Sequence, residues 1–142
     1  MQKKQIVYEV IFFVYLMLLI WIVLFKMEFS LANIFPVREI NYIPFYYDVI
    51  EGDAPVYEFI LNAVAFIPFG FLLAKAFRNI SFGEGIAVTF AVSLAFETLQ
   101  YVLSVGVSDI TDLIMNTLGG AVGIWLASVI YRKQKPKKIK KL

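Results

Sequence analysis

The sequence contains no cysteine and no histidine. Without cysteine there are no disulfide bonds, thiol nucleophiles or thiolate metal sites. Without histidine there are no imidazole ligands and no Ser–His–Asp triad. Acid–base chemistry would therefore fall to carboxylates, tyrosine, lysine or arginine. We expect no cofactor and no bound metal, and the sequence identifies no catalytic residue.

Charge is also scarce, because charged residues make up 17% of the 142 residues and hydrophobic residues make up 61%. The mean hydropathy is +0.77. Soluble domains are about 45–50% apolar, so this composition indicates a membrane protein. The length suits one small domain, and we predict a single domain over residues 1–142.

Most of the sequence consists of long apolar runs. A membrane-spanning helix needs about 20 mostly apolar residues, and four runs reach that length: 6–25, 56–77, 83–104 and 110–131. None of them alternates with the period of a strand. The first follows Lys3 and Lys4 as in a signal peptide, but no small-residue cleavage site comes after it. We predict an all-α polytopic membrane protein with four transmembrane helices, the first one retained.

Basic residues are distributed very unevenly. With four spans, 11 of the 13 Lys and Arg residues fall on one side: Lys3, Lys4, Lys75, Arg78, Arg132, Lys133, Lys135, Lys137, Lys138, Lys140 and Lys141. The positive-inside rule then places both termini in the cytoplasm and the 26–55 loop outside, in the plasma membrane. We interpret the tail, residues 132–142, as a topology anchor attracted to anionic lipid. We expect no nucleic-acid partner.

The outer loop between the first two spans contains an aromatic segment, VREINYIPF, over residues 37–45. Such a segment lies on the membrane surface, where aromatic residues gather, or dips into the membrane against protein. The second span contains Pro68 and Gly70, which predict a break in the helix. That break is either a packing kink or part of a binding feature.

Polar side chains interrupt the last three spans. An ionisable group within a membrane costs at least about 2.5–3.5 kcal/mol, so these residues need partners. At 1.5 Å per residue, Glu97, Asn116 and Asn62 lie about 8–10 Å inside the outer ends of three different helices. Gln100 and Asp112 lie about one turn closer to the surface. We therefore predict one polar site in the outer half of the membrane.

Each of these residues also has a structural interpretation. Asp109 or Ser108 is a candidate N-cap of the fourth span, with Asp112 in its first turn. The two asparagines are candidates for hydrogen bonds between helices. Glu97 is either protonated or paired with a cation, and we propose that the 37–45 segment folds over the outer ends of the last three spans and brings Arg38 near Glu97 or Asp112. One face of the fourth span carries Asp109, Asp112, Asn116, Gly119, Gly123 and Ala127, and it should pack into the bundle.

Four motifs appear in order along the chain: REINYIPF, NAVAFIPFG, ETLQ and DITDLIMNTLGG. Together they resemble the VanZ-like family of small bacterial membrane proteins. The resemblance implies a cell-envelope protein linked to tolerance of lipoglycopeptide antibiotics such as teicoplanin, and it supplies no settled reaction. Many members carry an arginine and an aromatic residue just before the acidic motif. Val107 and Ser108 stand in that region here, so no role of that arginine carries over.

Three functions are compatible with these features. The first is binding of an amphiphile, either lipid-linked cell-wall material or a lipoglycopeptide tail, at an outer-leaflet site. That site would comprise Arg38, Asn41, Asn62, Glu97, Gln100, Asp109, Asp112 and Asn116. The second is an enzyme that acts on a lipid or peptidoglycan precursor through carboxylates, with or without Mg²⁺. The third is an assembly subunit, which would form a homo-oligomer through the Gly119 and Gly123 face. Membrane lipid is a partner in every case.

Overall fold

The computed structural model describes residues 2–25, 39–45, 56–103 and 107–134. Four helices are present in these ranges: α1 (Gln2–Phe25), α2 (Val56–Ala76), α3 (Phe82–Leu103) and α4 (Ile110–Gln134). Each is long and apolar enough to cross a membrane. The predicted all-α, four-span architecture is therefore confirmed, and the predicted helix boundaries are close to the observed ones.

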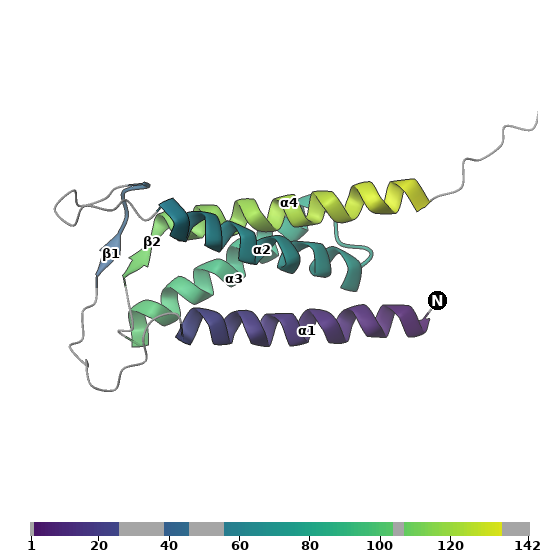
Figure 1. The fold of residues 1–142 in the computed structure, drawn as a ribbon, viewed down its shortest axis with the longest axis horizontal. Helices are drawn as coiled ribbons and strands as arrows, with labels where there is room; N and C mark the ends of the chain where they lie inside the picture. Colours follow the sequence, from purple (N-terminus) through teal and green to yellow (C-terminus); the bar gives the residue numbers. More distant parts are fainter. Residues whose placement is uncertain (1, 26–38, 46–55, 104–106, 135–142) are drawn as a thin grey trace, which may run out of the picture.

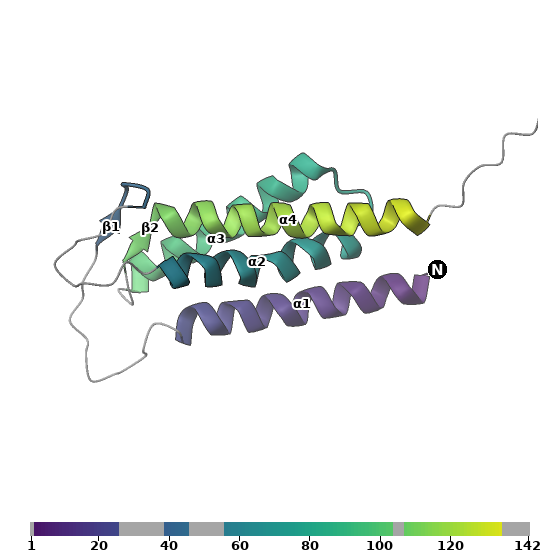
Figure 2. The same ribbon diagram turned by 45° about the horizontal axis from the view of Figure 1, so that its top comes forward.

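The helices form a bundle in which α2 and α4 lie side by side and make the most extensive contact. Helix α3 packs against α4, and α1 packs mainly against α2. The start of α1 and the end of α4 lie at one end of the bundle (Figures 1 and 2). The end of α1, the start of α2, the end of α3 and the start of α4 lie at the other end, which we call the loop end.

Local sequence explains where α3 begins. The Ser81 hydroxyl accepts the backbone N–H of Glu84, and the Glu84 carboxylate accepts the backbone N–H of Ser81 at 2.7 Å. This reciprocal capping box satisfies two amides that the first turn of a helix leaves without partners. Just before it, the Ile80 amide donates to the Phe77 carbonyl, which closes the short turn after α2.

Glycines bring the backbones of α2 and α4 into direct contact. A Cβ atom on Gly119 would lie 2.1 Å from the carbonyl oxygen of Ala63, and one on Gly123 would lie 2.0 Å from that of Ile67. From the other side, a Cβ atom on Gly70 would lie 2.0 Å from the carbonyl oxygen of Gly120. Only residues without a side chain permit this approach. The glycine face of α4 is therefore packed into the bundle, as predicted.

Aromatic and aliphatic side chains fill the space between α1 and α2. The cluster includes Phe12, Leu19, Phe66, Phe69 and Leu73. The Tyr15 hydroxyl of α1 donates to the Ala65 carbonyl at 2.7 Å, beside the Val64 carbonyl that Pro68 cannot pair with. Most of the remaining surface of α1 is exposed and apolar, as expected for a helix that faces lipid.

A two-stranded parallel pair closes the loop end, and the sequence did not predict it. Strand β1 (Ile40–Asn41) pairs with β2 (Ser108–Asp109), with Ile40 opposite Ser108 and Asn41 opposite Asp109. Figure 1 shows the pair at the loop end, with β1 outermost and β2 directly before α4. This pair joins the loop after α1 to the connection that precedes α4.

Candidate functional site

The β1–β2 pair holds residues 39–45, here called the cap, over the loop end of the bundle. The Ser108 amide donates to the Glu39 carbonyl at 3.0 Å. The cap is the described part of the predicted VREINYIPF segment. It contacts β2 and the start of α4 through the hydrogen bonds below, and α2 through one aromatic contact. Residues 37 and 38 of that segment lie outside the described residues.

Asp109 is the residue that connects the cap to α4. Its Oδ1 accepts the backbone N–H of Thr111 at 2.7 Å, which makes Asp109 the N-cap of α4 and confirms that predicted role. Its Oδ2 accepts a hydrogen bond from the Asn41 side chain at 3.0 Å. One carboxylate thus stabilises the first turn of α4 and anchors a loop that lies 68 residues earlier.

Glu97 forms the base of this network. It lies on α3 and is 5% exposed. Its Oε2 accepts the backbone N–H of Asp109 at 2.8 Å. When the nitrogen and oxygen of the Gln100 side-chain amide are exchanged, Gln100 Nε2 faces Glu97 and donates to the same oxygen at 2.9 Å. The Ser108 hydroxyl also serves this carboxylate as a hydrogen-bond donor.

The sequence left two states open for Glu97, a protonated side chain or a pair with a cation, and its described partners are N–H donors. Arg38 lies outside the described residues, so its proposed pairing stays a prediction. The nearby charges that act on Glu97 are the carboxylates of Asp112 and Asp109. Hydrogen bonds from backbone and amide N–H groups therefore satisfy this buried side chain within the described residues.

The far end of the cap is fastened at Phe45. Its backbone N–H donates to the Thr111 hydroxyl at 3.0 Å. Its φ is 57°, a left-handed conformation that is uncommon outside glycine. Its ring makes an edge-to-face contact with Phe59 of α2, at 6.0 Å between centroids. Contacts on both sides therefore hold a strained residue in place.

The outer surface of the cap is apolar and aromatic. Tyr42 is 75% exposed, and Ile40, Ile43 and Phe45 are also exposed. On the inner side, the Asn41 side chain accepts the Ile43 amide at 3.1 Å in addition to donating to Asp109. Asn41 thus ties the cap to the bundle, and Tyr42 and Ile43 leave exposed apolar surface next to the exposed Glu39.

A second polar pair lies deeper in the bundle. The Asn116 side chain of α4 donates to the Ser93 hydroxyl of α3 at 3.0 Å. Asn116 is 5% exposed, and its Oδ1 has no hydrogen-bond partner among the described residues. This contact is the bond between helices that the sequence suggested for Asn116.

The predicted site residues are thus separated into groups. Asn41, Glu97, Gln100 and Asp109 are joined in one network, and Asp112 lies close enough for its charge to act on Glu97. Asn116 belongs to the separate pair with Ser93. Within the described part of the chain, the hydrogen bonds do not connect Asn62 with either group. Asn62 is partly buried on α2, next to the Ala63 that faces Gly119.

Ser93 and Thr111 were not among the residues selected from the sequence. A signal for Ser93 was present, since the buried face of α3 carries a small or polar residue at four-residue spacing: Gly85, Thr89, Ser93 and Glu97. Thr111 sits inside the DITDL motif, between two residues that were selected. Its role depends on the position of Phe45, which local sequence does not reveal.

No group of three or more acidic side chains within residues 2–25, 39–45, 56–103 and 107–134 is arranged to hold a metal ion. The carboxylates of Glu97 and Asp109 are engaged by protein N–H donors instead. Chemically, the network holds two helices and the cap in a defined arrangement. The binding role predicted for its members stays a prediction.

Comparison with known proteins agrees with this architecture. A family model described as VanZ/LLP1 matches residues 12–131. The chain is 37% identical over 127 residues to Protein VanZ from Enterococcus faecium, which covers 88% of this chain and 76% of that protein. No solved structure matches the chain. The match extends from α1 through α4 and includes the cap and the Glu97 network, so this chain is a multi-pass membrane protein that belongs to the VanZ/LLP1 family.

Proposed function

We propose that this protein acts in the bacterial cell envelope and lowers susceptibility to lipoglycopeptide antibiotics such as teicoplanin by binding an amphiphile at its loop end. The amphiphile is the acylated antibiotic or a lipid-linked cell-wall component. The observation that carries the proposal is the cap, an exposed, largely apolar and aromatic segment held on the bundle by partly buried hydrogen bonds.

The network explains why such a surface would bind well. Immobilising a mobile segment costs free energy at the moment of binding, and a segment that is already held avoids much of that cost. Asp109, Glu97 and Thr111 hold the cap before any ligand arrives. The apolar side chains of Tyr42 and Ile43 would contact an acyl chain, and Asp112 and the Asn41 amide would lie near its head group.

The orientation of the chain is part of the proposal. Among the described residues, Lys3, Lys4, Lys75 and Arg78 lie near the end that carries the start of α1 and the end of α4. Acidic residues gather at the loop end, where Glu39, Glu97, Asp109 and Asp112 are located. By the positive-inside rule, this asymmetry supports an outward-facing cap and cytoplasmic termini.

The test compares cap variants with a matched variant elsewhere. Ile43 is 47% exposed on the cap and Ile11 is 44% exposed on α1, so Ile43→Ser and Ile11→Ser remove similar apolar surface. Loss of roughly 50 Å² of apolar contact corresponds to about 1 kcal/mol, or about fivefold in affinity. We expect Ile43→Ser and Tyr42→Ala to lower the inhibitory concentration of teicoplanin at unchanged protein level. Ile11→Ser should leave it unchanged.

Direct binding completes the test. Purified protein in nanodiscs should bind teicoplanin more tightly than the same glycopeptide without its acyl chain, and Ile43→Ser should reduce that difference. Equal binding of both glycopeptides, together with unchanged tolerance in both cap variants, would contradict the proposed function. Reduced tolerance without any binding to the antibiotic would point to the lipid-linked cell-wall component instead.

A further inference from the structure

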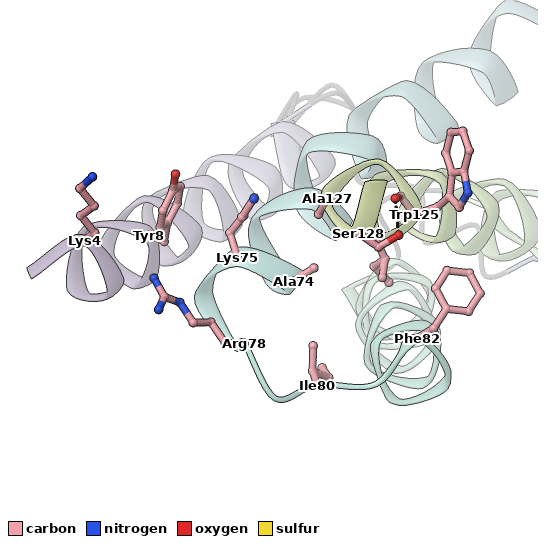
Figure 3. A pocket seen from close by; sticks show the side chains of 11 residues that line it. Lys4, Tyr8, Ala74, Lys75, Arg78, Ile80, Phe82, Trp125, Ala127 and Ser128 are labelled. Carbon is pink, nitrogen blue, oxygen red and sulfur yellow. Dashed lines mark hydrogen bonds between the residues drawn. The ribbon is translucent and has the colours of Figure 1, made fainter. Parts of the chain in front are cut away.

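A second polar feature lies at the opposite end of the bundle from the cap. A cavity of about 620 Å³ opens between the start of α1, the end of α2 with its following turn, the start of α3 and the last turns of α4. Figure 3 shows the side chains that surround it. The function proposed above makes no use of this cavity.

Positive charge is concentrated around the cavity. Lys4 comes from α1, Lys75 from the last turn of α2, and Arg78 from the turn that follows. Lys4 and Arg78 are exposed. No acidic side chain is among the described residues that line the cavity. Glu84, in the first turn of α3, is engaged in the capping box with Ser81. The net field at this opening therefore favours an anion.

Apolar and hydroxyl-bearing side chains form the rest of the lining. Ile80, Phe82, Ile124 and Trp125 supply apolar surface, and Tyr8 and Ser128 supply hydroxyl groups. The Ser128 hydroxyl donates to the Trp125 carbonyl at 2.7 Å, which leaves its oxygen able to accept a further bond. Figure 3 shows Lys4, Lys75 and Arg78 on the α1 side and Trp125 and Phe82 on the opposite side.

A ligand for such a cavity must carry both a negative charge and an apolar part. We propose that the cavity binds the phosphate head group of an anionic phospholipid from the leaflet on the side of the termini. Lys4, Lys75 and Arg78 contact the phosphate, and the acyl chains extend along the apolar lining toward the exposed surface of the bundle. Basic pockets between transmembrane helices bind anionic lipid head groups in this way. A free phosphate compound would leave the apolar half of the lining without a partner.

The chain itself provides a probe, because it has two tryptophans and Trp125 lines the cavity. A Trp21→Phe protein reconstituted in phosphatidylcholine vesicles would report on Trp125 alone. Phosphatidylglycerol or phosphatidylcholine with brominated acyl chains is then added at low mole fraction, since bromine quenches a tryptophan that it contacts. We expect Trp125 to be quenched preferentially by brominated phosphatidylglycerol.

Charge variants give the decisive comparison. Lys3 and Lys4 are adjacent on α1, and only Lys4 lines the cavity. Lys4→Gln and Arg78→Gln should each weaken the preference for phosphatidylglycerol about fivefold, as expected for about 1 kcal/mol per basic residue. Lys3→Gln should change it less than twofold. All three positions are exposed, so we expect unchanged helicity by circular dichroism, and the comparison uses proteins that meet that criterion.

Three results would overturn the proposal. Equal quenching by the two brominated lipids would show that the cavity does not prefer an anionic lipid. Equal effects of Lys3→Gln and Lys4→Gln would show that only general surface charge acts here. Displacement of brominated phosphatidylglycerol by millimolar glycerol 3-phosphate would show that the cavity serves a soluble phosphate compound and not a lipid. Persistence of quenching in excess glycerol 3-phosphate supports the lipid.

Discussion

From the close contact between α2 and α4 we predict how glycine-to-alanine substitutions change the stability of the protein. In Gly119→Ala, the new methyl group would lie 2.1 Å from the Ala63 carbonyl oxygen, and in Gly123→Ala it would lie 2.0 Å from that of Ile67. Real Cβ contacts are essentially never shorter than 3.0 Å. The obstacle is helix backbone, which cannot rotate away as a side chain can. Helix α4 must therefore move by roughly 1 Å, the difference between these distances.

Two opposing effects determine how much Gly119→Ala changes the free energy of unfolding. Overpacking of this kind costs about 1–3 kcal/mol, and a gap of 0.5–1 Å loses a quarter to half of the dispersion energy of each contact. Replacing glycine by alanine in a helix returns up to about 1 kcal/mol. We place the clash near the upper limit because it involves backbone, so Gly119→Ala should destabilise the protein by about 2 kcal/mol.

Gly83 provides the matched control. It lies near the start of α3, and a Cβ atom there would meet nothing within 4 Å. Gly83→Ala should therefore be neutral or stabilise the protein by up to about 1 kcal/mol. The same chemical change thus has opposite effects at two positions.

The assay is reversible unfolding in mixed detergent micelles with increasing sodium dodecyl sulfate, followed by far-ultraviolet circular dichroism. The double variant Gly119→Ala with Gly123→Ala should cost less than the sum of the single variants, because one displacement of α4 relieves both clashes. If Gly119→Ala and Gly83→Ala change the unfolding free energy equally, the reasoning from backbone contact is refuted.

Further predictions address the network, the deeper pair and the orientation. Glu97→Leu leaves the Asp109 amide unpaired and should cost about 1–3 kcal/mol in the same unfolding assay, whereas Glu97→Gln keeps a carbonyl acceptor and should cost less; equal costs would contradict the assigned bond. Asn41→Ala should speed hydrogen exchange in the cap, measured by mass spectrometry, while exchange in the centre of α2 stays unchanged, because Asn41 anchors only the cap. Asn116→Leu should be rescued in part by Ser93→Ala, since replacing both partners removes the unpaired hydroxyl; a double-mutant cycle with no coupling would argue against the contact. The chain has no cysteine, so Tyr42→Cys and Lys3→Cys each introduce a unique thiol. A membrane-impermeant maleimide should label Tyr42→Cys in intact cells and Lys3→Cys only after permeabilisation, and the reverse pattern would invert the proposed topology.

The helices themselves followed directly from local sequence. Hydropathy and length are properties of consecutive residues, so α1 to α4 were predicted with boundaries close to the observed ones. Helical periodicity likewise predicted that Asn116, Gly119, Gly123 and Ala127 share one buried face of α4. The N-cap role of Asp109 was predicted for the same reason, because a cap and the helix it stabilises are neighbours in sequence.

Only the three-dimensional structure shows which residues distant in sequence form hydrogen bonds or pack against each other. Periodicity places Glu97 on a buried face, but it cannot reveal that the backbone amide of Asp109 donates to its side chain. It also cannot reveal that Asn41 pairs with Asp109 across the β1–β2 contact, or that Gly119 faces Ala63 of the same chain. The expected self-association through that glycine face concerns a second copy and stays a prediction, while in this chain α2 occupies the face.

The loop end is the clearest case in which local sequence predicts one part of the structure and distant contacts determine another. Composition marked residues 37–45 as an aromatic segment that would lie on the membrane or enter it. The structure places residues 39–45 on β2, α4 and α2, with the left-handed Phe45 held by Thr111 and Phe59. A strained backbone conformation persists when surrounding contacts determine it. Those contacts join residues that are distant in sequence and close only in the packed structure, which is why pattern alone predicts the helices and not the cap that they support.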